Sequence, residues 1–540
     1  MKLDLFRGIQ DDFARRKPHY VNDWVDGWNL KTLAAILFIF CTSIGPAVTF
    51  AELLQSEVEV IGVVEVLLST AISAGIFSIF AGQPLVIVGV TGPVSILTIS
   101  IYGMAKALDI NFIPFYAWAQ IWAALMHMAL AALNACDYIA YVTRFSCETF
   151  GILIATIYLY TGISGVVKYF NEDSFSAALL QLLITLGTVW LAERLSLAKN
   201  WSVFNETARD LIADYGATLA LVFWAGVSFI GRAGDTDIPR VDTPSTFETT
   251  SGRDWFVDLG DIEGWAIVLA ILPGIIITVL FIFDHNVSSL MAQDPELNLK
   301  KGAAYHLDFF VLGFCILATG ILGIPPCNGL IPQAPLHTKA LAVTRVTEKN
   351  GVKIHKVEKV YEQRFSNLAQ ALMTLLMCFP PFLDVIGFLP QASLNGLFIF
   401  MGLASFDGNQ FFDRMMLMIT EASQRVSSHD FFQEVSFPSI KKFTAFQLLC
   451  CAVIFGITLT PAAMVFPLLI AALVALRVYL LPKHFEDAEL NSLDFLDVEG
   501  TLARLGGSGD AQAEHAPVPT EEVAANKGDI ETEVELTRGA

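Results

Sequence analysis

Two stretches of similar composition decide the fold: residues 83–95 read QPLVIVGVTGPVS, and residues 323–337 read GIPPCNGLIPQAPLH. Each lies in an otherwise apolar part of the chain and carries several glycines and prolines. Proline removes a backbone donor and favours extended backbone before it, so neither stretch can continue as a regular helix. Non-helical backbone at membrane depth persists only where protein packs around it or where it lines a polar cavity.

The chain around these stretches is built from long apolar runs. Of its 540 residues, 54% are hydrophobic and 16% are charged, whereas a soluble domain has about 25% charged residues. An apolar run of about 20 residues can cross a bilayer as a helix. We therefore predict an all-α membrane protein with fourteen transmembrane segments, at 33–54, 60–82, 84–104, 115–134, 148–167, 175–192, 211–231, 265–292, 307–323, 328–344, 366–381, 384–404, 443–459 and 461–481.

The positive charges between these segments indicate the orientation. Lys and Arg gather in alternate loops, such as 345–364, and in the N-terminal region 1–32, whereas the loop 232–263 is rich in Asp and Glu. Because cytoplasmic loops carry the excess of Lys and Arg, we expect both termini in the cytoplasm and loop 232–263 outside. The region before the first apolar segment is polar, so no cleavable signal peptide is expected.

The C-terminal region, residues 483–540, is strongly acidic. From residue 485 to 540 the chain has 14 acidic and three basic residues. This composition buries too little apolar surface to offset the entropy of ordering, so we predict a cytoplasmic, mostly disordered tail. The acidic balance gives no reason to expect nucleic-acid binding. It leaves open a function of another class, a membrane anchor whose tail recruits cytoplasmic proteins.

Seven segments, a loop and seven more segments indicate an inverted repeat. An odd number of crossings gives residues 33–231 and residues 264–482 opposite orientations in the membrane. The broken stretches are segments 3 and 10, the third of each half, so we expect half-helices there. The helix after each break presents free N–H groups and the positive end of its dipole, and two such ends make an anion site.

Asp284 is the candidate coupling residue. It lies within the run FIFDHNVSSL, residues 281–290, of segment 8. A carboxylate at the bilayer centre costs at least about 2.5–3.5 kcal/mol, so a functional role is expected. Ser288 shares its helix face by the i, i+4 spacing. The alternative interpretation is a structural hydrogen-bond anchor to a neighbouring helix.

Several longer motifs resemble the bicarbonate/borate transporter family, which includes the red-cell anion exchanger and the borate exporters of plants and fungi. The motifs are PAVTF at 46–50, EVLLSTA at 65–71, GQPLVIVG at 82–89, FDHNVSSLMAQ at 283–293, NGLIPQAPLHT at 328–338 and GLFIFMG at 396–402. The resemblance extends over about residues 5–500.

The resemblance implies a core domain of segments 1–4 and 8–11, which carries the substrate, and a gate domain of segments 5–7 and 12–14, which also forms a homodimer. Transport then occurs by elevator-like movement of the core against the gate. Asp284 matches the family's acidic position in segment 8. Gln333 stands where the red-cell exchanger has an arginine and the borate transporters have glutamine. The predicted substrate-binding residues are Gln83, Val90, Thr91, Gly92, Asp284, Asn286, Leu330, Ile331 and Gln333.

Glutamine in place of arginine leaves the helix ends as the main positive feature of the site, and their effect is modest and short-ranged. A hydroxyl-bearing solute fits this site better than chloride. The predicted function is secondary active transport, in the efflux direction, of borate or boric acid, coupled to protons or sodium, at the plasma membrane or the vacuole. Bicarbonate/chloride exchange is the alternative, and a nucleobase or sulfate transporter of the same architecture fits the physics alone. The sequence pattern predicts no enzymatic activity, metal or cofactor.

Overall fold

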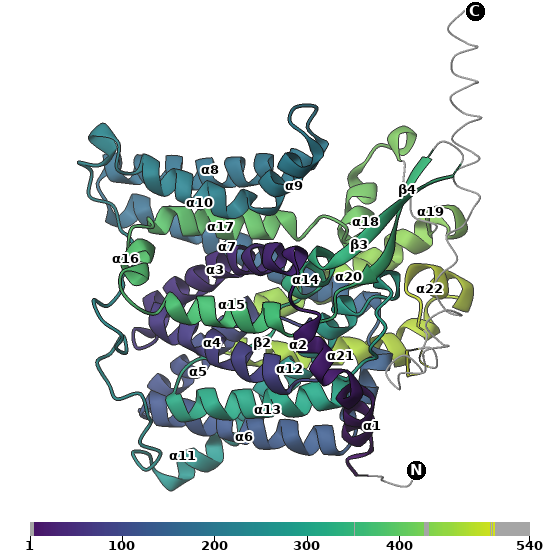
Figure 1. Ribbon diagram of the computed structural model, residues 1–540, viewed down its shortest axis with the longest axis horizontal. Helices are drawn as coiled ribbons and strands as arrows, with labels where there is room; N and C mark the ends of the chain where they lie inside the picture. Colours follow the sequence, from purple (N-terminus) through teal and green to yellow (C-terminus); the bar gives the residue numbers. More distant parts are fainter. Residues whose placement is uncertain (1–4, 350–351, 426–430, 497, 499–500, 503–540) are drawn as a thin grey trace, which may run out of the picture.

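The computed structural model describes residues 5–349, 352–425, 431–496, 498 and 501–502 (Figure 1). Residues 503–540, most of the predicted acidic tail, lie outside the described residues. Eight helices or helix runs of the described chain are long and apolar enough to cross a membrane: α3 (Leu30–Val58), α4 (Val63–Phe80), α7 (Arg144–Glu172), α8 with η3 (Phe175–Asn200), α11 with α12 (Gly264–Ala292), α13 (Tyr305–Leu322), α20 (Phe437–Thr458) and η7 through η8 (Ala463–Lys483). The predicted multi-pass helical membrane architecture is confirmed.

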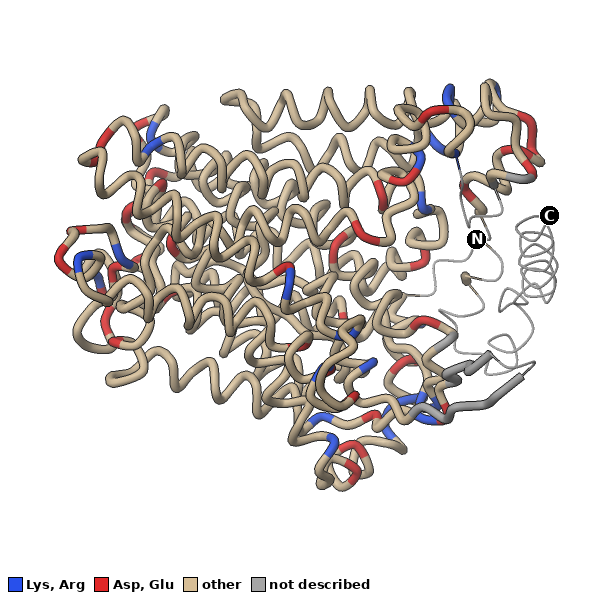
Figure 2. Tube along the Cα trace, turned by 90° about the horizontal axis from the view of Figure 1, so that it is seen from above, with Lys and Arg blue, Asp and Glu red and all other residues tan. Residues whose placement is uncertain are grey.

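Two further helix pairs qualify as membrane spans if each bent pair is counted as one. They are α6 (Phe112–Ala132) with η2 (Ala135–Tyr141), bent by 79°, and α9 (Glu206–Asp214) with α10 (Gly216–Val227), bent by 67°. Figure 2 shows charged residues gathered mostly toward the helix ends and loops, with long stretches of helix between them nearly free of charge. Such an apolar band is what a bilayer requires of the helices that cross it.

The two Gly/Pro-rich stretches are broken, as the sequence predicts. The first forms β1 (Val88–Gly89) and then α5 (Gly92–Ala107), and the second forms β2 (Asn328–Gly329) and then α14 (Gln333–Ala340). β1 and β2 pair antiparallel, with Val88 opposite Gly329 and Gly89 opposite Asn328. Each extended stretch thus provides hydrogen-bond partners for the other in an interior that water does not reach.

The second half-helix is shorter than predicted. α14 ends at Ala340, and the chain continues into a hairpin of β3 (Ala342–Lys349) and β4 (Val352–Val360). The reason is visible in residues 352–360, VKIHKVEKV, where four of the nine residues are β-branched Val or Ile. Enrichment in β-branched residues is typical of a strand. Much of the predicted basic loop 345–364 is therefore regular structure.

The helices pack in two sets (Figure 1). In the first set, α13 packs on α6 and α4, α15 (Phe365–Leu376) packs on α4 and α3, and α12 (Ile271–Ala292) packs on α6 and α14. In the second set, α17 (Gln391–Ala404) packs on α7 and α8 (Phe175–Ser196), and α20 packs on α7. The sets touch where α17 and α10 meet α3, and where α21 (Phe466–Tyr479) meets α12.

The first part of the predicted disordered tail is folded onto the second set. α22 (Asp487–Leu493) is followed by Asp494, which is 1% exposed and binds Arg477 of α21. The Asp494 carboxylate also accepts hydrogen bonds from Thr143 Oγ1 and the Phe145 amide, both at 2.8 Å. A carboxylate at the N-terminus of α7 is favoured by the helix dipole, which explains why the acidic sequence is ordered here.

Candidate functional site

The first break ends in a helix N-terminus with an open backbone donor at Gly92. Thr91 caps α5: its hydroxyl accepts from the Val94 amide at 3.4 Å, and its carbonyl accepts from the Ser95 amide at 3.0 Å. Pro93 has no N–H. Within this first turn, Gly92 therefore carries the amide that remains for a partner from outside the helix, at the positive end of the dipole.

The second break lies directly against the first. The Leu330 amide donates to the Ile87 carbonyl at 2.8 Å, which extends the β1–β2 pairing by one residue. α14 then begins at Gln333, whose Nε2 donates to the Thr42 carbonyl of α3 at 3.5 Å. Gln333 is 8% exposed, yet its Oε1 has no hydrogen-bond partner in the part of the protein that the structure describes.

α12 brings Asp284 and Ser288 to the same place. A Cβ added to Gly329 would lie 2.9 Å from the Ser288 Cβ and 3.2 Å from the His285 Cα, so β2 lies directly on this face of α12. The Asn328 side chain neighbours the Asp284 carboxylate. Asp284 is 2% exposed and Ser288 is fully buried, and neither Asp284 Oδ1 nor Ser288 Oγ has a partner among the described residues.

Several buried polar atoms at β2 therefore have no partner among the described residues, namely Asp284 Oδ1, Ser288 Oγ, Gln333 Oε1 and the donor Asn328 Nδ2 of β2 itself. Each such atom costs about 1–3 kcal/mol, which is why most buried polar atoms are paired. The carboxylate and amide oxygens can only accept hydrogen bonds, and the hydroxyl can accept or donate. The cluster is thus suited to a guest that donates hydrogen bonds, with the Gly92 amide as a donor in return.

The other predicted site residues take different positions. Val90 and Leu330 are buried beside the paired strands, and Ile331 is partly buried. Gln83 donates from Nε2 to Gln293 at 3.2 Å, at the end of α12 and about 13 Å along that helix from Asp284. Gln83 therefore lies apart from the cluster.

Asn286 also lies apart from the cluster. It is two residues from Asp284, which turns its side chain about 200° away around the helix. Its amide donates to the Ile282 carbonyl at 2.8 Å. The structure therefore gathers Thr91, Gly92, Asp284 and Gln333 around the breaks and places Gln83 and Asn286 in supporting positions.

The stretch that precedes β1 is fixed by side chains from three helices of the first set. His337 Nδ1 of α14 bonds to the Leu85 carbonyl at 2.8 Å. Asn367 Nδ2 of α15 donates to the carbonyls of Pro84 at 3.2 Å and Val86 at 3.0 Å. Asp308 Oδ1 of α13 accepts from the amides of Gly82 at 2.6 Å and Gln83 at 3.1 Å. Extended backbone in a membrane protein needs such partners, because no water satisfies it there.

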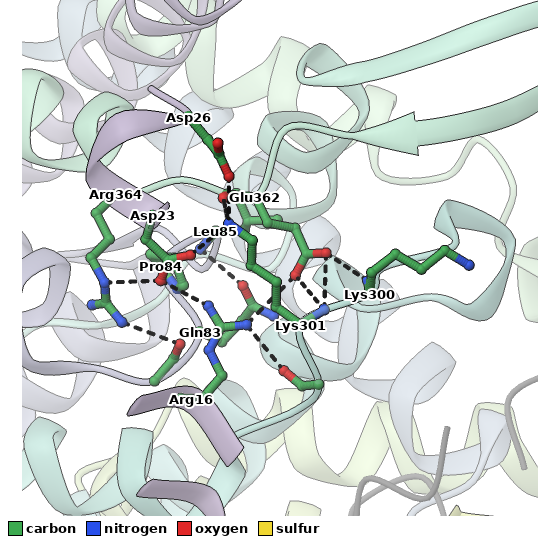
Figure 3. A network of polar contacts seen from close by, with 12 residues as sticks. Arg16, Asp23, Asp26, Gln83, Pro84, Leu85, Lys300, Lys301, Glu362 and Arg364 are labelled. Carbon is green, nitrogen blue, oxygen red and sulfur yellow. Dashed lines mark hydrogen bonds and ion pairs between the residues drawn. The ribbon is translucent and has the colours of Figure 1, made fainter. Parts of the chain in front are cut away.

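A network of buried charges holds the beginning of this stretch (Figure 3). Arg364 Nε donates to Asp23 Oδ2 at 3.2 Å, and its guanidinium nitrogens reach the carbonyls of Ser78 (3.0 Å), Ile79 (3.3 Å) and Gly82 (3.5 Å). Arg16 and Lys301 pair with the same Asp23 carboxylate at 3.1 and 2.9 Å. The N-terminal helix α2 (Tyr20–Val25), which carries Asp23, is thereby joined to α4 and α15.

The buried arginines of the described chain form ion pairs away from the cluster. Arg16 and Arg364 bind Asp23, Arg414 binds Glu148, and Arg477 binds Asp494. The positive potential at the breaks therefore comes from the helix N-termini.

Two residues at the breaks were missed by the sequence analysis as site residues. Asn328, beside Asp284, is a polar residue inside the second break, and that position was its signal. Tyr158 of α7 comes close to Gly92, since a Cβ added to Gly92 would lie 2.6 Å from the Tyr158 hydroxyl oxygen. Nothing in the sequence indicated this contact, because an aromatic residue in an apolar run is typical of packing or lipid exposure.

The close approach of β2 to α12 predicts a large effect of Gly329→Ala. The added methyl group overlaps the Ser288 Cβ and the α12 backbone, so unfolding free energy should fall by about 1–3 kcal/mol. Thermal unfolding of the purified protein in detergent measures this. Gly103→Ala is the matched control, because nothing lies within 4 Å of its added Cβ and alanine favours the helix by up to about 1 kcal/mol. Equal unfolding temperatures for both variants would contradict the packing of β2 on α12.

Comparison with known proteins places this geometry in a family. The family model of the HCO3− transporter integral membrane domain matches residues 4–178 and 174–498. A putative transporter of Schizosaccharomyces pombe is 36% identical over 495 residues, covering 90% of this chain and 95% of that protein. Boron transporter 1 of Saccharomyces cerevisiae is 35% identical over 504 residues, covering 90% and 85%. Human Band 3 anion transport protein is 28% identical over 541 residues, covering 95% and 59%.

The fold is also similar to a solved structure. The transmembrane domain of the cyanobacterial bicarbonate transporter BicA superposes with a TM-score of 0.54 at 14% identity, over 84% of this chain and 97% of that one. The family match covers both helix breaks and nearly all of the described chain. The resemblance inferred from the motifs is thus confirmed: this multi-pass integral membrane protein belongs to the HCO3− transporter family.

Proposed function

We propose that this protein is a secondary active transporter of borate or boric acid, which binds where α5 and α14 begin. The observation that carries the proposal is the set of buried, unpartnered acceptors at the breaks, Asp284 Oδ1 and Gln333 Oε1, with Ser288 Oγ beside them. Boric acid brings three hydroxyl donors and borate four, which is as many donors as these acceptors require. Relatives named boron transporters or probable boron transporters, at 30–35% identity over most of this chain, support the same substrate.

The charge of the site favours this substrate over chloride. Chloride has no hydrogen-bond donor and would meet the Asp284 carboxylate without compensation from a buried arginine, since the four buried arginines bind carboxylates elsewhere. Bicarbonate has a single hydroxyl to offer. A site with open acceptors discriminates strongly against a guest that leaves them unpaired, because each unpaired buried group keeps its desolvation cost.

We propose further that the first helix set is the moving core and the second set is the gate, in an inverted repeat of fourteen segments. The antiparallel pairing of β1 with β2, each followed by a helix N-terminus, supports the repeat. Hydrogen bonds connect the broken stretches to α12, α13, α14 and α15, and these bonds support movement of the first set as one rigid body. Both termini are placed in the cytoplasm on the positive-inside pattern.

Asp284 is proposed as the coupling group. A buried carboxylate that must be neutralised by solute, proton or sodium links binding of the substrate to binding of the ion. Export across the plasma or vacuolar membrane, and a homodimer formed through the second set, are proposed from the resemblance. The face of α8 that carries Phe175, Leu179, Leu183, Leu186 and Trp190 is apolar and exposed, as a dimer interface in the membrane requires.

A flux assay with the purified protein in liposomes tests the function. Boron, bicarbonate and chloride fluxes are measured separately, with imposed pH and sodium gradients. We expect boron flux that depends on one gradient and is insensitive to chloride. Chloride-dependent bicarbonate flux without boron flux would instead assign the exchanger function. Removal of residues 500–540 should leave boron flux intact, whereas a protein that serves as an anchor would show no flux in either form.

A further inference from the structure

The open amide at the start of α5 already has a neighbour from the other helix set. Tyr158 lies in α7, and its ring fills the space beside Gly92: a Cβ added there would lie 2.5 Å from the Tyr158 Cε1 and 2.6 Å from the hydroxyl oxygen. The Gly92 backbone and the Tyr158 hydroxyl are therefore close neighbours. A side chain of the second set thus lies directly beside the Gly92 amide, which has no partner within α5.

The position of the Tyr158 ring is defined by its neighbours. Its centroid lies 5.9 Å from that of Phe50 of α3 and 5.9 Å from that of Phe398 of α17. Phe50 belongs to the first set and Phe398 to the second, so Tyr158 stands at the boundary between the sets. The Asp284 carboxylate is also close enough to interact with it electrostatically. Tyr158 therefore lies near the start of α5, in the same region as the open acceptors.

We propose that, without solute, the Tyr158 hydroxyl oxygen accepts a hydrogen bond from the Gly92 amide. The bound solute then displaces the hydroxyl from this amide. Tyr158 is then a specificity-determining residue: a solute binds tightly only if its own oxygen accepts from Gly92 better than a phenol does. The contact joins α5 to α7, so its loss on binding removes one of the contacts between α5 and the second set. This inference rests on the proposed function, because it takes borate as the displacing solute.

Tyr158→Phe tests the proposal with little risk to folding, since the ring and its packing stay. Without the hydroxyl, the solute no longer competes for the amide, so borate should bind about 2- to 10-fold more tightly, as expected for the net value of one hydrogen bond. Borate affinity is measured by calorimetry on the full-length protein in detergent. Tyr160→Phe is the matched control: Tyr160 is on the same helix, is 50% exposed and packs on Phe455. Its affinity should equal that of the wild type.

The outcomes are separable. If the wild-type protein binds borate and Tyr158→Phe binds it equally or more weakly, the displacement is overturned while the proposed function stands. Weaker binding would show that the hydroxyl contacts the solute rather than competing with it. If the wild-type protein shows no borate binding, the proposed function and this inference fail together. A second readout is thermal stability without borate, which should fall slightly in Tyr158→Phe and stay unchanged in Tyr160→Phe.

Discussion

Asp284→Asn is expected to lower borate transport about 100-fold in liposomes. The carboxylate accepts hydrogen bonds from the solute, and loss of about 3 kcal/mol of charge-assisted hydrogen bonding corresponds to that factor. The remaining flux should no longer respond to the pH or sodium gradient, because the asparagine side chain cannot be neutralised by an ion. The measurement is boron flux at several substrate concentrations with each gradient applied in turn.

The stability of the same variant separates the two interpretations of Asp284. A buried carboxylate with an unpartnered oxygen is costly, so its neutral isostere should unfold at the same or a higher temperature. A structural anchor would instead lose stability and transport together. Asp109→Asn is a suitable control, because Asp109 is an exposed loop residue with φ 55°, a conformation that asparagine tolerates well. Its transport and unfolding temperature should match those of the wild type.

The breaks and Asp284 could be predicted from the sequence because their signals are local. Glycine and proline interrupt helices wherever they stand, and a lone acidic residue in an apolar run needs a reason. The pairing of β1 with β2, in contrast, joins residues about 240 positions apart, and no local pattern specifies it. The sequence could therefore place two half-helices without showing that their extended stretches hydrogen-bond to each other.

The sequence also could not separate site residues from their supports. Gln83 and Asn286 are polar residues in the right segments, and they resemble Gln333 and Asp284 in every local respect. The difference lies in their positions: Gln83 bonds to Gln293 at the end of α12, and Asn286, bonded to the Ile282 carbonyl, is turned about 200° around α12 from Asp284. Tyr158 is the opposite case, a residue at the breaks that the sequence did not predict. Its contact with Gly92 depends on how α7 packs against α5.

Arg364→Met is expected to lower the free energy of unfolding by about 1.5–3 kcal/mol, the range for losing hydrogen bonds to a charged group. The substitution keeps the apolar stem but removes one of the three cations that bind the buried Asp23, leaving Arg16 and Lys301. It also removes the donors for the carbonyls at the end of α4 and at Gly82, where the chain enters the first broken stretch. Thermal and denaturant unfolding in detergent measure the loss.

The comparison variant is Arg7→Gln, which likewise removes one positive charge, here from the N-terminal helix α1 (Arg7–Arg16). Arg7 lies 3.8 Å from Asp11, and their side chains are 68% and 63% exposed, so solvent and salt screen this pair and its loss should cost less than about 1 kcal/mol. Equal effects of the two variants would mean that the charge network does not stabilise the fold.

Arg364→Lys separates the role of the charge from that of the guanidinium. Lysine keeps the charge but lacks the planar fork that reaches Asp23 and the α4 carbonyls together. It should therefore recover less than half of the unfolding free energy that Arg364→Met loses. Because the same guanidinium fixes the entry to β1, boron flux should fall in Arg364→Lys even at temperatures where the protein stays folded.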